Sequence, residues 1–355
     1  MVSAFDGVIG HRQVLAMLEE DAARPAQAYL FAGPSSVGKA TVARRFAALL
    51  LCDAGDRGCV RRVAAGVHPD LIGVEPDGRT SLTVEQARRT VARAVLAPVE
   101  AARKVFLFEE AGLMTDDAAN TLLKTLEEPT PTTVFLLVAE SEDELPPTVA
   151  SRCRSVFFGR VPDGEITAAL VNAGIDAEQA ARAAATAGGR PGLAEMLATR
   201  PEVAAYRAAW LGVPARLTGR PGEAFLLAAE LVEAAEPLLA GLTERQQAEA
   251  DRADDEGPAA RAMRDRHDRE RRRALAALHV TGLEILASWY RDAAAAQFGA
   301  PVRNRDLAPA QLTTVSPAAA VGRASRVLQT IDSLDANQRP ELALAALFSD
   351  LATSS

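Results

Sequence analysis

The stretch GPSSVGK, residues 33–39, decides the fold class of this chain. The apolar run AYLFA precedes it at residues 28–32, and apolar side chains recur at helical spacing through residues 41–51. A G-x-x-x-x-G-K loop between a strand and a helix holds phosphate through its backbone N–H groups and its lysine. The stretch therefore predicts a phosphate-binding loop. The alternative is a glycine-rich turn that contains a lysine by chance.

The residue after this lysine departs from the pattern. Ala40 stands where Ser or Thr would ligate Mg²⁺ through its hydroxyl. Thr41 lies about a hundred degrees further around the helix, and we do not expect it to substitute. Phosphate can therefore still bind, whereas metal-assisted chemistry is expected to be impaired. The candidate nucleotide-binding residues of the loop are Gly33, Ser36, Val37, Gly38, Lys39, Ala40 and Thr41.

Two further apolar runs, VFLF at residues 105–108 and VFLLV at residues 134–138, have the length of strands. Continuous apolar runs are typical of strands that are buried on both faces of a parallel sheet. Between them Thr115 can cap a helix that Pro129 ends. We therefore predict a three-layer α/β domain, a parallel sheet with helices on both faces. The predicted inner face of the helix is Ala119, Leu122, Leu123 and Leu126.

Two acidic residues, Glu109 and Glu110, follow the first of these runs. In a Walker B segment the first acid organises Mg²⁺ and the second polarises the attacking water. Both are therefore candidate nucleotide-site residues. Glu109 is longer than the usual Asp and would hold a metal in a different geometry. The alternative is a pair of acids that only leave a strand.

After about residue 160 the signals for strands stop and the pattern becomes helical. The stretch GGRPG at residues 188–192 separates two helices, and the chain from about residue 204 is almost wholly helical in pattern. Residues 244–273 are dense in charge, which favours a solvated helix over a nucleic-acid site. The predicted i,i+4 charge pairs are Asp265 with Arg269 and Asp268 with Arg272.

Composition limits the classes of protein. The 355 residues suffice for about two or three domains, and no apolar run is long enough to predict a transmembrane helix. The start of the chain has no secretory signal, and Cys52, Cys59 and Cys153 make no disulfide framework, which predicts a cytoplasmic protein. The net charge of -8 provides no overall basic field, so we expect mainly protein partners.

Several motifs in the first 200 residues occur together in a recognisable order. LLKTLEEP at residues 122–129 is followed by the apolar run and then by SRC at residues 151–153. FDGVIG at residues 5–10 and AGVHPD at residues 65–70 agree with them. Together they resemble the AAA+ clamp-loader family.

The resemblance implies a division of the chain. It predicts a P-loop AAA+ ATPase-like domain at residues 1–158 and a helical lid at residues 159–203. An all-α collar or oligomerisation domain is expected at residues 204–355. The function implied is that of a subunit in the ATP-driven ring that loads a sliding clamp on primed DNA. The implied partners are the delta subunit, the gamma/tau ATPases, the clamp and primer–template DNA, with no membrane and no polymerase site in this chain.

Within the family, departures from the motor pattern favour the delta-prime type of subunit. Ala139 stands where a polar sensor is usual, and Gly192 and Leu193 stand where motor subunits place a sensor arginine, with Arg190 nearby. Together with Ala40 they predict weak or absent binding of ATP and Mg²⁺ and little hydrolysis. The alternative is an active AAA+ ATPase, a gamma/tau-like motor. A small-molecule P-loop kinase leaves SRC unexplained.

Arg152, in the SRC motif, is the candidate catalytic residue. The resemblance implies that it acts in trans as an arginine finger in a neighbouring ATP site. There a guanidinium stabilises charge on the γ-phosphate, worth roughly 10³–10⁵ in rate. The alternative is a structural arginine that pairs with a nearby carboxylate. Arg154 follows closely, but the spacing of the motif favours Arg152.

Relatives often carry four cysteines after the P-loop helix as a zinc module. Here only Cys52 and Cys59 occupy that region, with His68 as a conceivable third ligand and no fourth. Because structural zinc takes four ligands, we expect no zinc, and buried or inert thiols instead. No other metal is expected.

Overall fold

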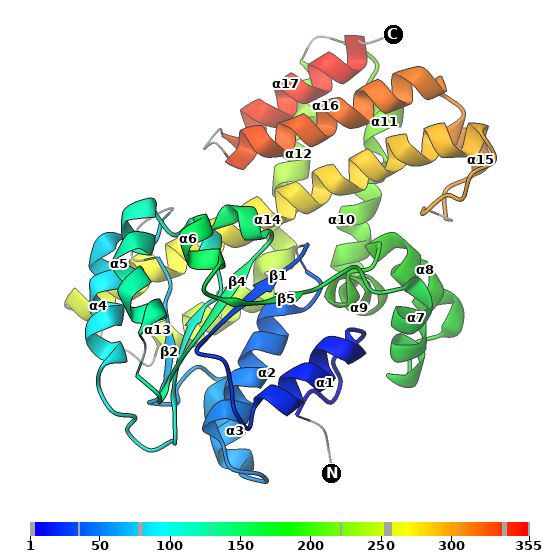
Figure 1. The fold of residues 1–355 in the computed structure, drawn as a ribbon. Helices are drawn as coiled ribbons and strands as arrows, with labels where there is room; N and C mark the ends of the chain where they lie inside the picture. Colours follow the sequence, from blue (N-terminus) through cyan, green and yellow to red (C-terminus); the bar gives the residue numbers. More distant parts are fainter. Residues whose placement is uncertain are drawn as a thin grey trace. The chain divides into compact units, whose positions relative to one another are not determined.

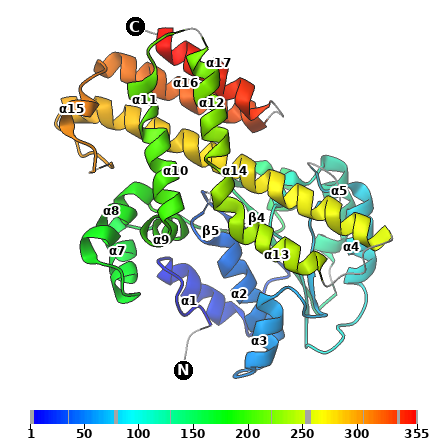
Figure 2. The ribbon, with the colours of Figure 1, turned by 180° about the vertical axis from the view of Figure 1, so that it is seen from behind.

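The computed structural model describes residues 4–34, 36–76, 81–128, 130–220, 222–251, 258–304, 306–335 and 339–353. They form two compact units (Figures 1 and 2). The first runs to Gly174 and includes Ala187–Ala194, and the second contains Ile175–Thr186 and the chain from Glu195 onward. The finer division at residues 158 and 203 stays a prediction.

The first unit is built on a parallel five-stranded sheet in the order β2-β3-β4-β1-β5 (Figure 1). The strands are β1 (Ala28–Ala32), β2 (Leu71–Gly73), β3 (Lys104–Phe108), β4 (Thr133–Ala139) and β5 (Arg154–Phe157). The helices are α1 (Arg12–Asp21), α2 (Lys39–Leu51), α3 (Arg57–Ala64), α4 (Val84–Ala94), η1 (Ala111–Leu113), α5 (Asp116–Glu127), η2 (Glu142–Glu144), α6 (Pro147–Ala150) and α7 (Asp163–Asn172).

Side chains alternate between the two faces of this sheet. In β1, Tyr29 and Phe31 enter a core with α1 and α2, whereas Leu30 enters a second core with α4 and α5. Every residue of β1, β3 and β4 is buried, as continuous apolar runs require when helices cover both faces. The predicted three-layer α/β class is confirmed.

The predicted helix of the LLKTLEEP segment is α5. The Thr115 hydroxyl accepts a hydrogen bond from Ala118 N at 3.3 Å, which is the expected cap. Ala119, Leu122 and Leu126 are buried on its inner face, and Leu123 is partly buried. Pro129, predicted to end the helix, lies outside the described residues.

The second unit is helical throughout its described part (Figure 2). Its core gathers around Trp210, Tyr290 and Phe348, all fully buried. None of the described helices has the length and apolarity needed to cross a membrane. The helices are α8 (Ala177–Ala187), α9 (Pro191–Thr199), which the two units share, α10 (Pro201–Leu211), α11 (Val213–Arg216), α12 (Glu223–Glu233), η3 (Glu236–Leu239), α13 (Ala240–Ala250), α14 (Pro258–Gln297), α15 (Pro309–Leu312), α16 (Pro317–Asp335) and α17 (Pro340–Thr353).

The charge-dense stretch spans α13 and the start of α14. Arg271 pairs with Glu236 of η3, and Gln246 donates to the carbonyl oxygen of His267 at 3.1 Å. The ion pair joins the stretch to η3, and the hydrogen bond joins the two helices of the stretch to each other. The side chains of Asp265 and Arg269, predicted to pair, lie outside the described residues.

Candidate functional site

The predicted phosphate-binding loop lies between the end of β1 and the start of α2. Gly33 has φ 148°, and an added Cβ there would lie 2.1 Å from the carbonyl oxygen of Phe158, so only glycine fits. Gly38 has φ 103°, and Ser36 is left-handed at φ 59°. The backbone therefore forms the tight turn that the sequence predicted. Ser35 lies outside the described residues.

Lys39, the loop lysine, bonds to its own loop. It is only 7% exposed, and its Nζ donates to the carbonyl oxygens of Gly33 at 2.5 Å and Pro34 at 2.6 Å. Burial lowers the pKa of Lys39, and the carboxylates of Glu140 and Glu144 oppose that shift. A phosphate ligand would have to compete with these two carbonyls for the ammonium group.

The residue after the loop lysine offers no side-chain ligand for a metal. Ala40 is half-buried and has no hydroxyl, and Thr41 is exposed one residue further along. Mg²⁺ demands near-octahedral oxygen ligands at short distances. The ligand that the P-loop pattern normally provides is therefore missing at position 40.

The two acids of the Walker B segment lie directly after β3. Glu109 forms a two-point ion pair with Arg44 of α2: Arg44 Nε donates to Oε1, and Nη2 donates to Oε2 at 2.8 Å. Glu110 precedes η1, and its carbonyl oxygen accepts from Leu113 N at 3.1 Å. Both carboxylate oxygens of Glu109 thus already hold a cation, so the residues present do not fit a bound Mg²⁺ as they stand.

Arg44 was not singled out from the sequence, because its partner Glu109 lies 65 positions away. It follows Ala40 by four residues, which places the two on the same face of α2. The small Ala40 side chain leaves that face open for the longer arginine.

The sensor positions are also apolar or internally bonded. Ala139 ends β4, is buried, and pairs in register with Ala32 at the start of the loop. Its methyl group can offer no hydrogen bond to a nucleotide. Arg190, which lies just before α9, is buried, and its Nε donates to the carbonyl oxygen of Ala187 at 3.0 Å.

His11, which has no nearby partner residue in the sequence to suggest catalysis, also contacts the phosphate-binding loop. Its Nε2 lies 3.1 Å from the carbonyl oxygen of Val37, and its ring meets Phe158 edge-on at 4.9 Å. Burial lowers the pKa of His11, and its hydrogen bond to Val37 opposes that shift. No local sequence pattern marks this contact, because it forms between residues 26 positions apart.

Arg152, the predicted finger, follows α6 on an exposed turn. It donates to the carbonyl oxygen of Thr148 at 2.7 Å and pairs with Glu127 of α5. Within the chain it therefore makes the contacts of a structural arginine, and its role in trans stays a prediction. Arg154 pairs with Asp21 of α1 at 3.0 Å.

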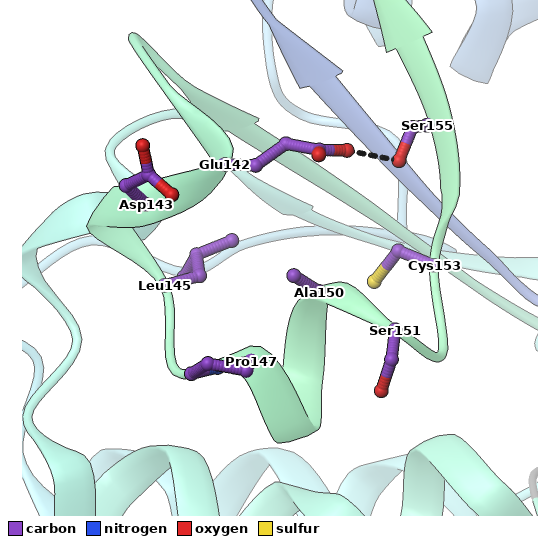
Figure 3. A pocket seen from close by; sticks show the side chains of 8 residues that line it. All are labelled: Glu142, Asp143, Leu145, Pro147, Ala150, Ser151, Cys153 and Ser155. Carbon is purple, nitrogen blue, oxygen red and sulfur yellow. Dashed lines mark hydrogen bonds between the residues drawn. The ribbon is translucent and has the colours of Figure 1, made fainter.

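A pocket of about 500 Å³ lies beside this turn, between η2, α6 and β5 (Figure 3). The free Cys153 lines it, and burial raises the pKa of that thiol to about 12, so the thiol stays protonated at neutral pH. Glu142 accepts a hydrogen bond from Ser155 across the pocket (Figure 3). The other lining residues are Asp143, Leu145, Pro147, Ala150 and Ser151.

The expectation of free thiols at Cys52 and Cys59 is wrong. The two sulfurs form a disulfide that joins the end of α2 to α3, with the Cα atoms 5.7 Å apart. The Asp56 carboxylate caps α3 by accepting from Gly58 N and Cys59 N, each at 2.9 Å, and this turn brings Cys59 back toward α2. Bonded sulfurs are not available as thiolate ligands for zinc.

His68, considered as a further zinc ligand, instead takes part in hydrogen bonds that hold two loops together. Its Nδ1 accepts from Asp70 N at 3.1 Å, and its Nε2 lies 3.0 Å from the Glu100 carboxylate. The buried Asp70 carboxylate in turn accepts the N–H groups of Val99, Glu100 and Ala101. Among the described residues, no group of three or more His, Cys, Asp and Glu side chains is placed to hold a metal.

The chain is similar in sequence to several replication proteins. It is 40% identical over 139 residues to DNA polymerase III subunit delta' of Pseudomonas aeruginosa, covering 37% of this chain and 42% of that one. The delta' subunit of Bacillus subtilis is 35% identical over 150 residues, covering 40% and 44%. The tau subunit of Escherichia coli is 35% identical over 158 residues, covering 42% and 24%. The chain thus spans less than half the length of these curated relatives.

A solved structure, a DNA polymerase III gamma subunit-related protein from Thermotoga maritima, aligns with 96% of this chain and 98% of its own. Its identity is 14% and its TM-score is 0.45. The family described as DNA polymerase III, delta subunit, matches residues 10–162. These residues contain the loop, the two acids and Arg152 described above. Through this part, the chain is similar to clamp-loader subunits of DNA polymerase III, delta' among them.

Proposed function

We propose that this chain is a clamp-loader subunit of DNA polymerase III of the delta-prime type, which serves in an ATP-driven ring without hydrolysing ATP itself. The observation that carries the proposal is the lack of polar groups around an intact P-loop. Ala40 and Ala139 have methyl groups at positions where hydrolysis needs a polar side chain. Phosphoryl transfer depends on a positioned metal and on polar groups around the γ-phosphate. A site without them can keep its fold and lose its turnover.

The partners follow from the proposed role. The chain would join the delta subunit and the gamma/tau ATPases in the cytoplasm and help to load the sliding clamp on primer–template DNA. With a net charge of -8, it would meet DNA through the assembled ring rather than by a basic field of its own.

Arg152 is proposed to act as a finger in a neighbouring ATP site. Its ion pair with Glu127 is no obstacle, because exposed pairs are worth about 0.2–1 kcal/mol, whereas a finger is worth roughly 10³–10⁵ in rate. Glu127 can therefore hold the arginine in the free chain and release it on assembly.

The first experiment measures ATP hydrolysis by the purified chain alone, with Mg²⁺, beside a Lys39→Ala variant. We expect no turnover that depends on Lys39. The variant also removes the lysine's bonds to Gly33 and Pro34, so its folding is checked by circular dichroism. If the wild type hydrolyses ATP and a folded Lys39→Ala variant does not, the alternative of an active, gamma/tau-like ATPase is favoured. Lys39, Glu110 and the similarity to tau support that alternative.

The second experiment measures the DNA-stimulated ATPase of the reconstituted complex with Arg152→Ala. We expect a large loss of activity with assembly unchanged. Arg154→Ala is the matched control, because this neighbouring arginine is also exposed but pairs with α1. Full activity in an assembled Arg152→Ala complex would reject the finger.

A further inference from the structure

Arg44 is a residue of the P-loop helix that the hydrolytic pattern does not require. It shares a face of α2 with Ala40 and reaches the end of β3, where it bonds both carboxylate oxygens of Glu109. The charge of Glu109 and its hydrogen bond, with the charge of Glu75, raise the pKa of the Arg44 guanidinium. A permanent positive charge thus lies beside the acid that would otherwise organise a metal.

The two positions that would hold Mg²⁺ have changed in a related way. Ala40 withdraws a hydroxyl ligand, and Glu109 has both oxygens bonded to a cation. A divalent ion would have to displace the guanidinium and would still lack one ligand. The missing hydroxyl at position 40 and the Arg44–Glu109 ion pair thus both oppose a bound divalent ion.

We propose that Arg44 is the resident cation of this P-loop site. Its guanidinium takes the place of the divalent ion, and a nucleoside di- or triphosphate binds there without a metal. The inference rests on the proposed function of the loop as a nucleotide site without hydrolysis, and it adds the chemistry of that site.

The chemistry of arginine suits this role. A guanidinium has five N–H donors, and the ion pair with Glu109 uses two of them, through Nε and Nη2. The remaining donors are free of Glu109 and can meet phosphate oxygens, which arginine recognises well. One positive charge neutralises a phosphate chain less than Mg²⁺ does, and Lys39 is held by loop carbonyls. Binding is therefore expected to be weak.

The test is calorimetric binding of ADP and of the non-hydrolysable analogue AMP-PNP, in EDTA and in excess Mg²⁺. The variants are Arg44→Ala, Ala40→Thr and the double variant. For the wild type we expect Kd values that agree within about threefold between the two conditions. Arg44→Ala should weaken binding in EDTA by about tenfold, through loss of charge-assisted bonds. The double variant restores a hydroxyl and frees Glu109, so Mg²⁺ should tighten its binding by about tenfold or more.

Arg45→Ala is the matched control, because Arg45 is the next residue of α2 but donates to the carbonyl oxygen of Asp6. It should bind nucleotide as the wild type does. The proposal is overturned if Mg²⁺ tightens wild-type binding about tenfold, or if the double variant gains no dependence on Mg²⁺. Undetectable binding of both nucleotides to the wild type in both conditions would overturn it as well. Mg²⁺-dependent nucleotide binding without ATP hydrolysis would reject the role of Arg44 as the resident cation but would still agree with the proposed function.

Discussion

A single methyl group at Gly282 should unsettle the helical unit. Gly282 lies within α14, where Trp210 of α10 packs directly on its backbone. An added Cβ would lie 2.1 Å from Cε2 of Trp210 and 2.4 Å from Nε1 and Cζ2. The indole is fully buried and has Tyr206 and Phe348 as edge-on neighbours. It cannot retreat without moving the core.

The magnitude follows from two opposing terms. Replacing glycine by alanine inside a helix gains about 1 kcal/mol. Overpacking a core costs about 1–3 kcal/mol and sometimes more, and a contact 2.1 Å long demands a large shift. We expect Gly282→Ala to lower the free energy of unfolding by about 2 kcal/mol. Gly322→Ala is the matched control: Gly322 lies within α16 with no heavy atom within 4 Å of an added Cβ, so it should raise stability by about 1 kcal/mol.

The assay is urea unfolding followed by tryptophan fluorescence. The chain has two tryptophans, Trp210 and Trp289, and both lie in the second unit, so the signal reports that unit alone. A Gly282→Ala variant as stable as the wild type would refute the packing argument. Trp210→Phe tests it independently, because Gly282→Ala should cost less when the indole is gone.

Two further predictions concern covalent and acid–base chemistry. The double variant Cys52→Ala, Cys59→Ala removes the disulfide and should destabilise the first unit by about 2.5 kcal/mol, the chain-entropy value for so short a loop. Dithiothreitol should lower the stability of the wild type but not of the variant. His279 is 3% exposed, and neither of its ring nitrogens has a hydrogen-bond partner among the described residues. Burial lowers the pKa of His279, and the charge of Glu236 opposes that shift. The neutral ring therefore contributes stability above the ordinary pKa of 6.5 that is lost as the pH falls below it, with a slope approaching about 1.4 kcal/mol per pH unit. His279→Leu should flatten that slope in urea titrations between pH 7.5 and about 5.5, and an unchanged slope would exclude His279 as its source.

Local patterns predicted the centre of the sheet but not its edges. The runs predicted at 28–32, 105–108 and 134–138 correspond to β1, β3 and β4, because strands buried on both faces are continuously apolar. The edge strands were not predicted. β2 has only three residues, and β5 has four, of which only Val156 is buried. Neither is long enough to give a clear period.

The candidate site shows the same limit. Ala40 and Ala139 are visible as departures, because the loop and the strand end fix where a polar group should stand. The Arg44–Glu109 pair joins residues 65 positions apart, so no local pattern marks it until helix and strand are placed together. The disulfide was missed because Cys52 and Cys59 approach only through the turn that Asp56 caps.

The residues that build the loop differ from those that would perform its chemistry. Gly33 is required because Phe158 approaches too closely for any side chain, and Lys39 bonds to the loop carbonyls, so both support the backbone even without a ligand. The methyl groups of Ala40 and Ala139 donate no hydrogen bond to the loop. At positions 40 and 139 the chain thus lacks polar groups that metal-assisted hydrolysis uses, while the residues that shape the loop are present. The proposed subunit without ATP hydrolysis requires this combination, because its loop must keep its shape while metal-assisted turnover is not needed.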